Sequence, residues 1–130
     1  MEVMLVKDLL FEGVCTAMVT PFCDGKLNIP LFRRLLSRQI QAGIHAFVIS
    51  GTTGEAPTLS HGEKIRLFKE TKDWIGSQGT VLAGTGNNCT RTAVRLSQAA
   101  EDRLPPDLLQ TGNRGGYDGK RRQEPAVYRP

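Results

Sequence analysis

Residues 46–50 read Ala46-Phe47-Val48-Ile49-Ser50, and residues 51–55 continue as Gly51-Thr52-Thr53-Gly54-Glu55. The first stretch is short and almost wholly apolar, which is typical of a strand in a parallel sheet that is covered on both faces. The second stretch predicts a loop rich in glycine and threonine. Since parallel α/β folds bind ligands where the carboxyl ends of their strands open into loops, this segment indicates both a fold class and a candidate site.

Strand-like and helix-like segments alternate on either side of it. Residues 13–20 form an apolar run that predicts an earlier strand, and residues 23–26 predict a polar loop with an Asp-Gly turn. A first helix is predicted from Pro30, with Gly43 suited to end it in a left-handed conformation. Its apolar residues recur at helical spacing: Leu31, Leu35, Leu36 and Ile40.

Two further elements follow the loop. Ser60 and Glu63 stand three residues apart, as in a capping box, and predict a helix whose apolar face carries Ile65, Phe68 and Ile75. Residues 80–84 predict a third strand. A last helix is predicted to start at a Thr90 cap and to turn Ala93, Leu96 and Ala100 inward. The predicted strands start at intervals equal to the length of a β-α-β unit. Three such units fit either an open doubly wound sheet or the first part of an eight-fold barrel.

The pattern stops after Asp102. Residues 104–109 are too interrupted by proline to predict a fourth strand, and residues 114–122 are rich in glycine and arginine without apolar spacing. We therefore expect one structured region over residues 1–102 and an irregular or disordered basic tail over residues 103–130.

Composition narrows the classes of function. The chain has 130 residues, 39% of them hydrophobic, and no apolar run long enough to span a bilayer, so no membrane partner is expected. The net charge is +4, of which +3 belongs to residues 103–130, so the body is nearly neutral and no nucleic-acid partner is expected.

Charged residues near the start argue against a signal peptide, and we expect a cytoplasmic protein. Three scattered cysteines and two histidines show no metal-ligand spacing, and no cofactor is expected.

Two loops are candidates for binding. In residues 51–55, two adjacent hydroxyls and free backbone N–H groups could hold a small carboxylate or phosphate, and Glu55 could act as acid or base or tie the loop together. A purely structural turn explains the same residues. Residues 84–88, Gly84-Thr85-Gly86-Asn87-Asn88, are similar to a phosphate loop but lack the third glycine of a dinucleotide site and the lysine of a P-loop, which favours a turn or interface role.

Three motifs together give the chain a family resemblance. These are Thr16-Ala17-Met18-Val19-Thr20-Pro21-Phe22, the 51–55 loop followed by Thr58-Leu59-Ser60 and Glu63, and Ala83-Gly84-Thr85-Gly86-Asn87. In this order and separation they resemble the start of the dihydrodipicolinate synthase / N-acetylneuraminate lyase family, over about residues 13–102. The resemblance implies an α/β fold consisting of the first three β/α units of a (β/α)8 TIM barrel.

The resemblance also implies class I aldolase chemistry. In that family a lysine forms a Schiff base with pyruvate, and the resulting enamine attacks an aldehyde. Its loop maps here onto Thr52 as a proton relay and onto Thr53 as a contact of the pyruvate carboxylate. The double threonine favours the synthase branch, which serves lysine biosynthesis. The family forms homo-oligomers, and the sequence leaves the oligomeric state of this chain open.

Part of the family pattern is missing. The Schiff-base lysine follows the sixth strand in that family, and none of the six lysines here matches it. Residues 117–120 match the family's tyrosine-containing Thr-Pro-Tyr-Tyr-Asn motif only faintly. We therefore expect a truncated fragment that is inactive alone, with a frame shift near Asp102 as one hypothesis. The alternatives are a non-catalytic partial barrel that partners a full-length homologue, or a small nucleotide- or nucleic-acid-binding domain that uses the Gly84 loop and Lys120-Arg121-Arg122.

Overall fold

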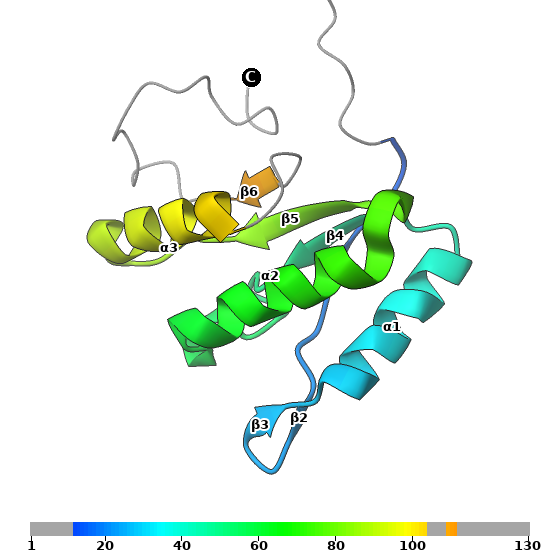
Figure 1. The fold of residues 1–130 in the computed structure, drawn as a ribbon, viewed down its shortest axis with the longest axis horizontal. Helices are drawn as coiled ribbons and strands as arrows, with labels where there is room; N and C mark the ends of the chain where they lie inside the picture. The colour runs from blue at the N-terminus through cyan, green and yellow to red at the C-terminus, as the bar shows by residue number, and fades with distance from the viewer. Residues whose placement is uncertain (1–11, 104–108, 112–130) are drawn as a thin grey trace, which may run out of the picture.

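A parallel four-stranded sheet organises the protein (Figure 1). The computed structural model describes residues 12–103 and 109–111. The strands lie in the order β1 (Cys15–Ala17), β4 (Ala46–Ile49), β5 (Thr80–Gly84) and β6 (Leu109–Thr111). In this register Phe47 lies beside both Thr16 and Val81, so the first three strands are aligned at the same level.

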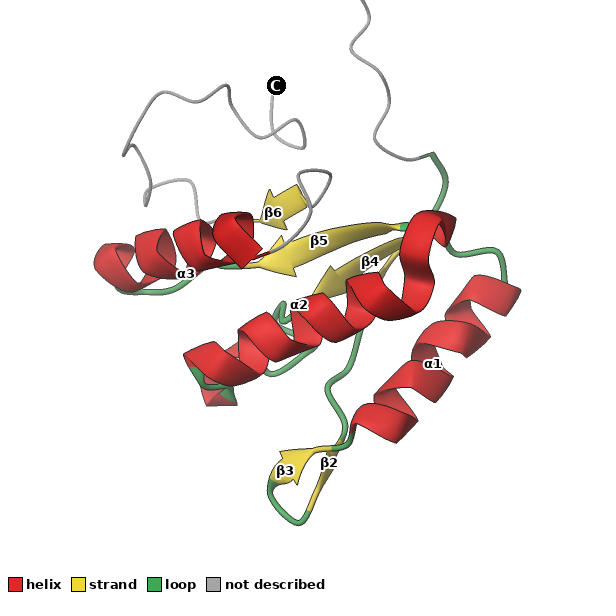
Figure 2. Cartoon of the chain, in the orientation of Figure 1, coloured by secondary structure: helices red, strands yellow, loops and turns green. Residues whose placement is uncertain are grey.

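Three helices connect the strands and pack against one another in sequence order (Figure 2). They are α1 (Ile29–Gln41), α2 (His61–Ile75) and α3 (Thr90–Arg103), with the short 3-10 turns η1 (Ala56–Thr58) and η2 (Gly76–Gln78). The core lies between this helical layer and the sheet. Its largest fully buried side chains include Phe32, Phe47 and Phe68. The predicted strand–helix alternation is confirmed, and within the described residues no helix has the length and apolar character to cross a membrane.

Helix α1 begins and ends as its sequence predicts, but its buried face is different. The Asn28 side chain accepts a hydrogen bond from the Leu31 N–H at 3.1 Å, and Gly43 adopts a φ of 85° after the helix. The buried residues are Ile29, Phe32 and Leu36. Leu31, predicted on that face, is 37% exposed. The buried stripe starts at Ile29, and residues two positions apart in the sequence lie on different sides of a helix.

Helices α2 and α3 follow the predictions closely. The capping box of α2 is present, with the Glu63 N–H donating to Ser60 and the Ser60 N–H donating to Glu63. The predicted inward residues of both helices are buried: Ile65, Phe68, Ile75, Ala93, Leu96 and Ala100. Thr90 is the first residue of α3 and not its cap, since the Cys89 carbonyl accepts the hydrogen bond from the Ala93 N–H at 3.0 Å.

The loop before α1 contains a small hairpin that the sequence analysis did not predict. Strands β2 (Phe22–Cys23) and β3 (Lys26–Leu27) pair antiparallel. The predicted turn between them is confirmed, because Asp24 and Gly25 have φ values of 50° and 70°, the backbone that a two-residue hairpin with an Asp-Gly pair requires.

The expectation that no fourth strand follows Asp102 is wrong. Strand β6 pairs in parallel with β5, placing Leu109 beside Leu82 and Thr111 beside Gly84. The prolines that argued against a strand, Pro105 and Pro106, precede β6 in the sequence and so remove no donor from its ladder. Arg103, the first residue of the predicted irregular tail, is the last residue of helix α3, so the tail prediction is wrong there as well; residues 104–108 and 112–130, which include 114–122, lie outside the described residues.

Strands β4 and β5 approach each other so closely at their carboxyl ends that only glycine fits at position 84. A Cβ on Gly84 would lie 2.2 Å from the Ser50 carbonyl oxygen and 2.6 Å from its carbonyl carbon. Both atoms belong to the backbone, so no side-chain movement can relieve the contact. The loops that follow the two strands therefore start side by side.

Gly84→Ala is expected to lower the free energy of unfolding by about 3 kcal/mol, since the new methyl group would push the two strand ends apart. Urea unfolding followed by the fluorescence of Trp74 measures this loss. The matched control is Gly62→Ala in α2, where a Cβ meets nothing within 4 Å and alanine should be neutral or slightly stabilising. Equal stability of the two variants would contradict the close approach.

Candidate active site at the carboxyl ends of the parallel strands

The two loops singled out in the sequence come together around one pocket. It has a volume of about 490 Å³ and lies where β4 and β5 end. Ligand sites of parallel α/β folds lie at this end of the strands. The lining residues come from the first loop, the second loop and helix α2: Ser50, Gly51, Thr52, Ala56, Pro57, Lys64, Gly84, Gly86, Asn87 and Asn88.

Backbone hydrogen bonds hold the first loop in a compact turn. The N–H groups of Gly54 and Ala56 both donate to the Gly51 carbonyl, and the Glu55 N–H donates to the Thr52 carbonyl at 3.0 Å. The N–H groups of Thr52 and Thr53 have no acceptor within the described structure. Two neighbouring free N–H groups in such a turn are available as donors to an anion.

The turn is also fixed against the end of β1. The buried Thr20 hydroxyl donates to the Gly54 carbonyl at 2.7 Å, and a Cβ on Gly54 would lie 3.0 Å from the Met18 carbonyl oxygen. Glycine at position 54 therefore lets the loop sit directly on this strand end. As a result, Thr52 and Thr53 are exposed side chains on a backbone that is tied down on both sides.

The predicted site residues do not all occupy the same place. Thr52 lines the pocket, whereas Thr53 and Glu55 are exposed outside its lining. Glu55 has a φ of 58°, and its carbonyl accepts hydrogen bonds from both the backbone N–H and the hydroxyl of Thr58, each at 2.9 Å. It thus ties the loop together through its backbone, while its carboxylate makes no hydrogen bond to the described residues.

The second loop is tied to helix α3. Thr85 is fully buried and accepts a hydrogen bond from the Ser97 hydroxyl at 2.9 Å. The Asn87 side chain accepts one from the Cys89 N–H at 2.8 Å, which closes the turn before the helix. Gly86, Asn87 and Asn88 therefore present a fixed polar wall to the pocket.

Sequence reasoning missed Lys64, the charged residue of this pocket. The residue is only 5% exposed, and within the described part of the chain it has no carboxylate partner. Burial lowers the pKa of Lys64, because removal from water disfavours the ammonium form. The signal was available in the sequence: Lys64 shares its spacing with Phe68, Thr71 and Ile75, so a charge stands on the buried stripe of α2.

Ser50 is the second residue that the sequence did not reveal. It is 2% exposed with a φ of 59°, and its hydroxyl oxygen is buried without a hydrogen-bond partner among the described residues. An unpaired buried hydroxyl costs free energy unless a ligand satisfies it. Together with Lys64 and the free N–H groups, it gives a pocket whose lining holds donors and one cation but no carboxylate. Such a pocket is suited to a small anion.

Lys64→Met is expected to stabilise the protein at pH 7 by about 1 kcal/mol, because a buried ammonium without a partner is removed. Since the folded-state pKa of Lys64 lies below its ordinary 10.5, the wild type should gain stability as the pH rises from that lowered pKa toward 10.5. The variant should lack this gain, so the difference in the free energy of unfolding between Lys64→Met and the wild type should shrink as the pH rises. Urea unfolding at several pH values from 7 to 10 measures it.

The control for this prediction is Lys69→Met on the same helix. Lys69 is exposed, and its hydrogen bond to Asp73 raises its pKa. This variant should gain no stability at pH 7. The same pH profile for both variants would contradict the assignment of the cost to Lys64.

Comparison with known proteins identifies the family. The model of the Dihydrodipicolinate synthetase family matches residues 10–103. The 4-hydroxy-tetrahydrodipicolinate synthase of Moorella thermoacetica is 49% identical over 89 residues, and that of Oenococcus oeni is 48% identical over 89 residues. Each alignment covers 68% of this chain and 30% of the relative, so the chain spans about a third of the length of these proteins.

Solved structures agree on the fold. Dihydrodipicolinate synthase from Thermotoga maritima has a TM-score of 0.72 at 34% identity, over 80% of this chain and 36% of that one. The 4-hydroxy-tetrahydrodipicolinate synthase of Methylacidiphilum fumariolicum has a TM-score of 0.70 at 37% identity, over 77% and 33% of the two chains. The predicted fold is confirmed, since the parallel strands and helices match the amino-terminal portion of these TIM barrels. This chain belongs to the dihydrodipicolinate synthetase family.

Proposed function

We propose that this chain provides the carboxylate-binding part of a pyruvate-dependent synthase of the 4-hydroxy-tetrahydrodipicolinate synthase type. The observation that carries the proposal is the pocket at the ends of β4 and β5, which offers one cation and several donors but no carboxylate. Pyruvate is a small anion of matching charge, and relatives of this chain bear the name of that synthase.

In this proposal the free N–H groups of the loop hold the pyruvate carboxylate, Thr52 from the pocket lining and Thr53 from directly beside it, since Thr53 itself lies outside that lining. The backbone N–H groups of Thr52 and Thr53 are the free donors of the loop, and Ser50 and Gly51 connect them to the end of strand β4. Lys64 of α2 adds positive charge to the pocket lining, which strengthens the attraction for a carboxylate because the residue is largely removed from water. These groups orient the keto acid; they do not attack it.

Thr52 relays protons during the reaction. A hydroxyl can donate one hydrogen bond while it accepts another, which is what a relay between two other groups requires. Its place in the pocket lining, on a backbone fixed by the turn, suits that role. The covalent step belongs to a lysine on a later barrel strand, whose amine forms the imine with the pyruvate carbonyl and releases water. Alone, the 130-residue chain is therefore expected to bind pyruvate without turning it over.

A second candidate function is a non-catalytic partial barrel that docks onto a full-length homologue. The observation that favours it is the edge position of β1, which pairs only with β4 in the described sheet. An unpaired strand edge is a template for another strand. Co-expression with a full-length family member would raise the yield of soluble chain under this alternative and would leave it unchanged otherwise.

A segment exchange tests the synthase proposal. Residues 12–103 would replace the matching segment of the Moorella thermoacetica enzyme, and the chimera would be assayed for condensation of pyruvate with aspartate semialdehyde. We expect activity, and Thr52→Val in the chimera should lower kcat by about 100-fold or more, as removal of a general acid–base group does.

Thr58→Val is the matched control in the same loop, because the Thr58 hydroxyl bonds only to the Glu55 carbonyl and lies outside the pocket. It should leave kcat within a few-fold of the unmodified chimera. A folded chimera that binds no pyruvate would overturn the proposal, and equal losses in the two variants would remove Thr52 from the relay.

A further inference from the structure

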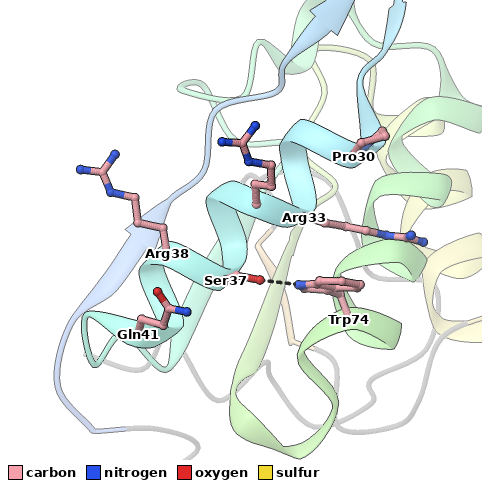
Figure 3. A pocket seen from close by; sticks show the side chains of 7 residues that line it. Pro30, Arg33, Ser37, Arg38, Gln41 and Trp74 are labelled. Carbon is pink, nitrogen blue, oxygen red and sulfur yellow. Dashed lines mark hydrogen bonds between the residues drawn. The ribbon is translucent and has the colours of Figure 1, made fainter.

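A second pocket lies on the outer surface of the helical layer and shares no residue with the first (Figure 3). It has a volume of about 510 Å³ and is lined by Pro30, Arg33, Arg34, Ser37, Arg38 and Gln41 of α1 and by Trp74 of α2. The α1 residues recur at intervals of three and four, so they form one stripe along the helix. We refer to this pocket as the α1 groove.

Positive charge is concentrated in the α1 groove. Its lining holds three arginines and no carboxylate. Arg33 pairs with Glu70 of α2 at 2.5 Å, but Glu70 also lies 3.9 Å from Arg66, so one acid serves two arginines. Arg34 and Arg38 have no ion pair with any described residue. They stand four residues apart on one helix face, where like charges repel.

An exposed aromatic ring forms the other wall. Trp74 is 45% exposed, and its indole N–H donates to the Ser37 hydroxyl at 2.9 Å. The Arg33 guanidinium extends across the ring, 5.1 Å from its centroid, and its buried Nε has no hydrogen-bond partner among the described residues. Tryptophan and arginine are enriched among the few residues that dominate the binding energy of protein interfaces, and a side-chain geometry set in advance lowers the entropy cost of binding.

The shape of the groove distinguishes between kinds of anion. From Pro30 to Gln41 the stripe is about 16 Å long, given the rise of an α-helix. Figure 3 shows Arg38 projecting away from the Trp74 ring, so the charge of Arg38 lies apart from the exposed aromatic surface. A single phosphate bound at Arg34 and Arg38 would leave Trp74 uncovered. An extended acidic segment with an apolar side chain matches both surfaces.

We propose that the α1 groove docks an acidic segment of a partner protein, with carboxylates paired to Arg34 and Arg38 and an apolar side chain on Trp74. Helices form the outer layer of a β/α barrel, so this face stays outside whether or not further strands are present. The proposal does not depend on the function of the pyruvate pocket.

Trp74 is the only tryptophan of the chain, so its fluorescence reports on the groove directly. The probe is a synthetic hexapeptide of four glutamates, one phenylalanine and one leucine, titrated into the 130-residue chain. We expect a saturable change in Trp74 fluorescence, which the same peptide with lysines in place of the glutamates should not produce. Arg34→Ala combined with Arg38→Ala should weaken binding by about tenfold, the combined effect of two exposed ion pairs.

The matched control is Arg91→Ala combined with Arg95→Ala, an exposed pair with the same spacing on α3. It removes the same charge and should leave the affinity unchanged. If both double variants weakened peptide binding equally, the affinity would depend only on the net charge of the chain, and the proposal would be overturned. Binding of inorganic tripolyphosphate that is as tight as that of the acidic peptide would do the same, because it would identify a phosphate site. No fluorescence change with the acidic peptide would also reject it.

Discussion

The contact between Gly84 and the Ser50 carbonyl is the constraint on which the site depends. A Cβ at position 84 would lie 2.2 Å from that oxygen, so the carboxyl ends of β4 and β5 can meet only because one of them ends in glycine. The Thr52 loop and the Asn87 loop then start from adjacent points and line one pocket. Thr52 and Asn87 are 35 residues apart in the sequence, and they line one pocket because Gly84 has no side chain to separate the two strand ends.

The pocket departs from the packing rules that the core obeys. Phe32, Phe47 and Phe68 are fully buried among apolar neighbours, whereas Lys64 and Ser50 are buried polar groups without partners in the described structure. Natural proteins tolerate such costs where they bind ligands, because the ligand supplies the missing partner. An anion between Lys64 and the free N–H groups of the loop would give Lys64 an ionic partner and the N–H groups an acceptor. The proposed function therefore rests on the pocket and not on the core.

Much of the fold was predictable, because local rules decide it. The Asp24-Gly25 turn, the Ser60–Glu63 capping box and the apolar strands each follow from residue type and spacing. The errors arose where tertiary position decided the outcome. Leu31 has helical spacing but faces outward, and β6 forms because a sheet edge is available beside β5. Of the residues that line the pocket, Thr52 was singled out by its motif, while Lys64 was missed because a lysine in a first helical turn ordinarily faces water.

The most direct test is a titration of the isotope-labelled 130-residue chain with pyruvate, followed by the amide resonances of each residue. We expect shift changes concentrated in residues 50–56 and 84–88, together with a change at the side-chain amine of Lys64, and none along the α1 groove. Changes spread over other surfaces, or no change at millimolar pyruvate in a folded sample, would contradict the claim that the ends of β4 and β5 form a carboxylate site.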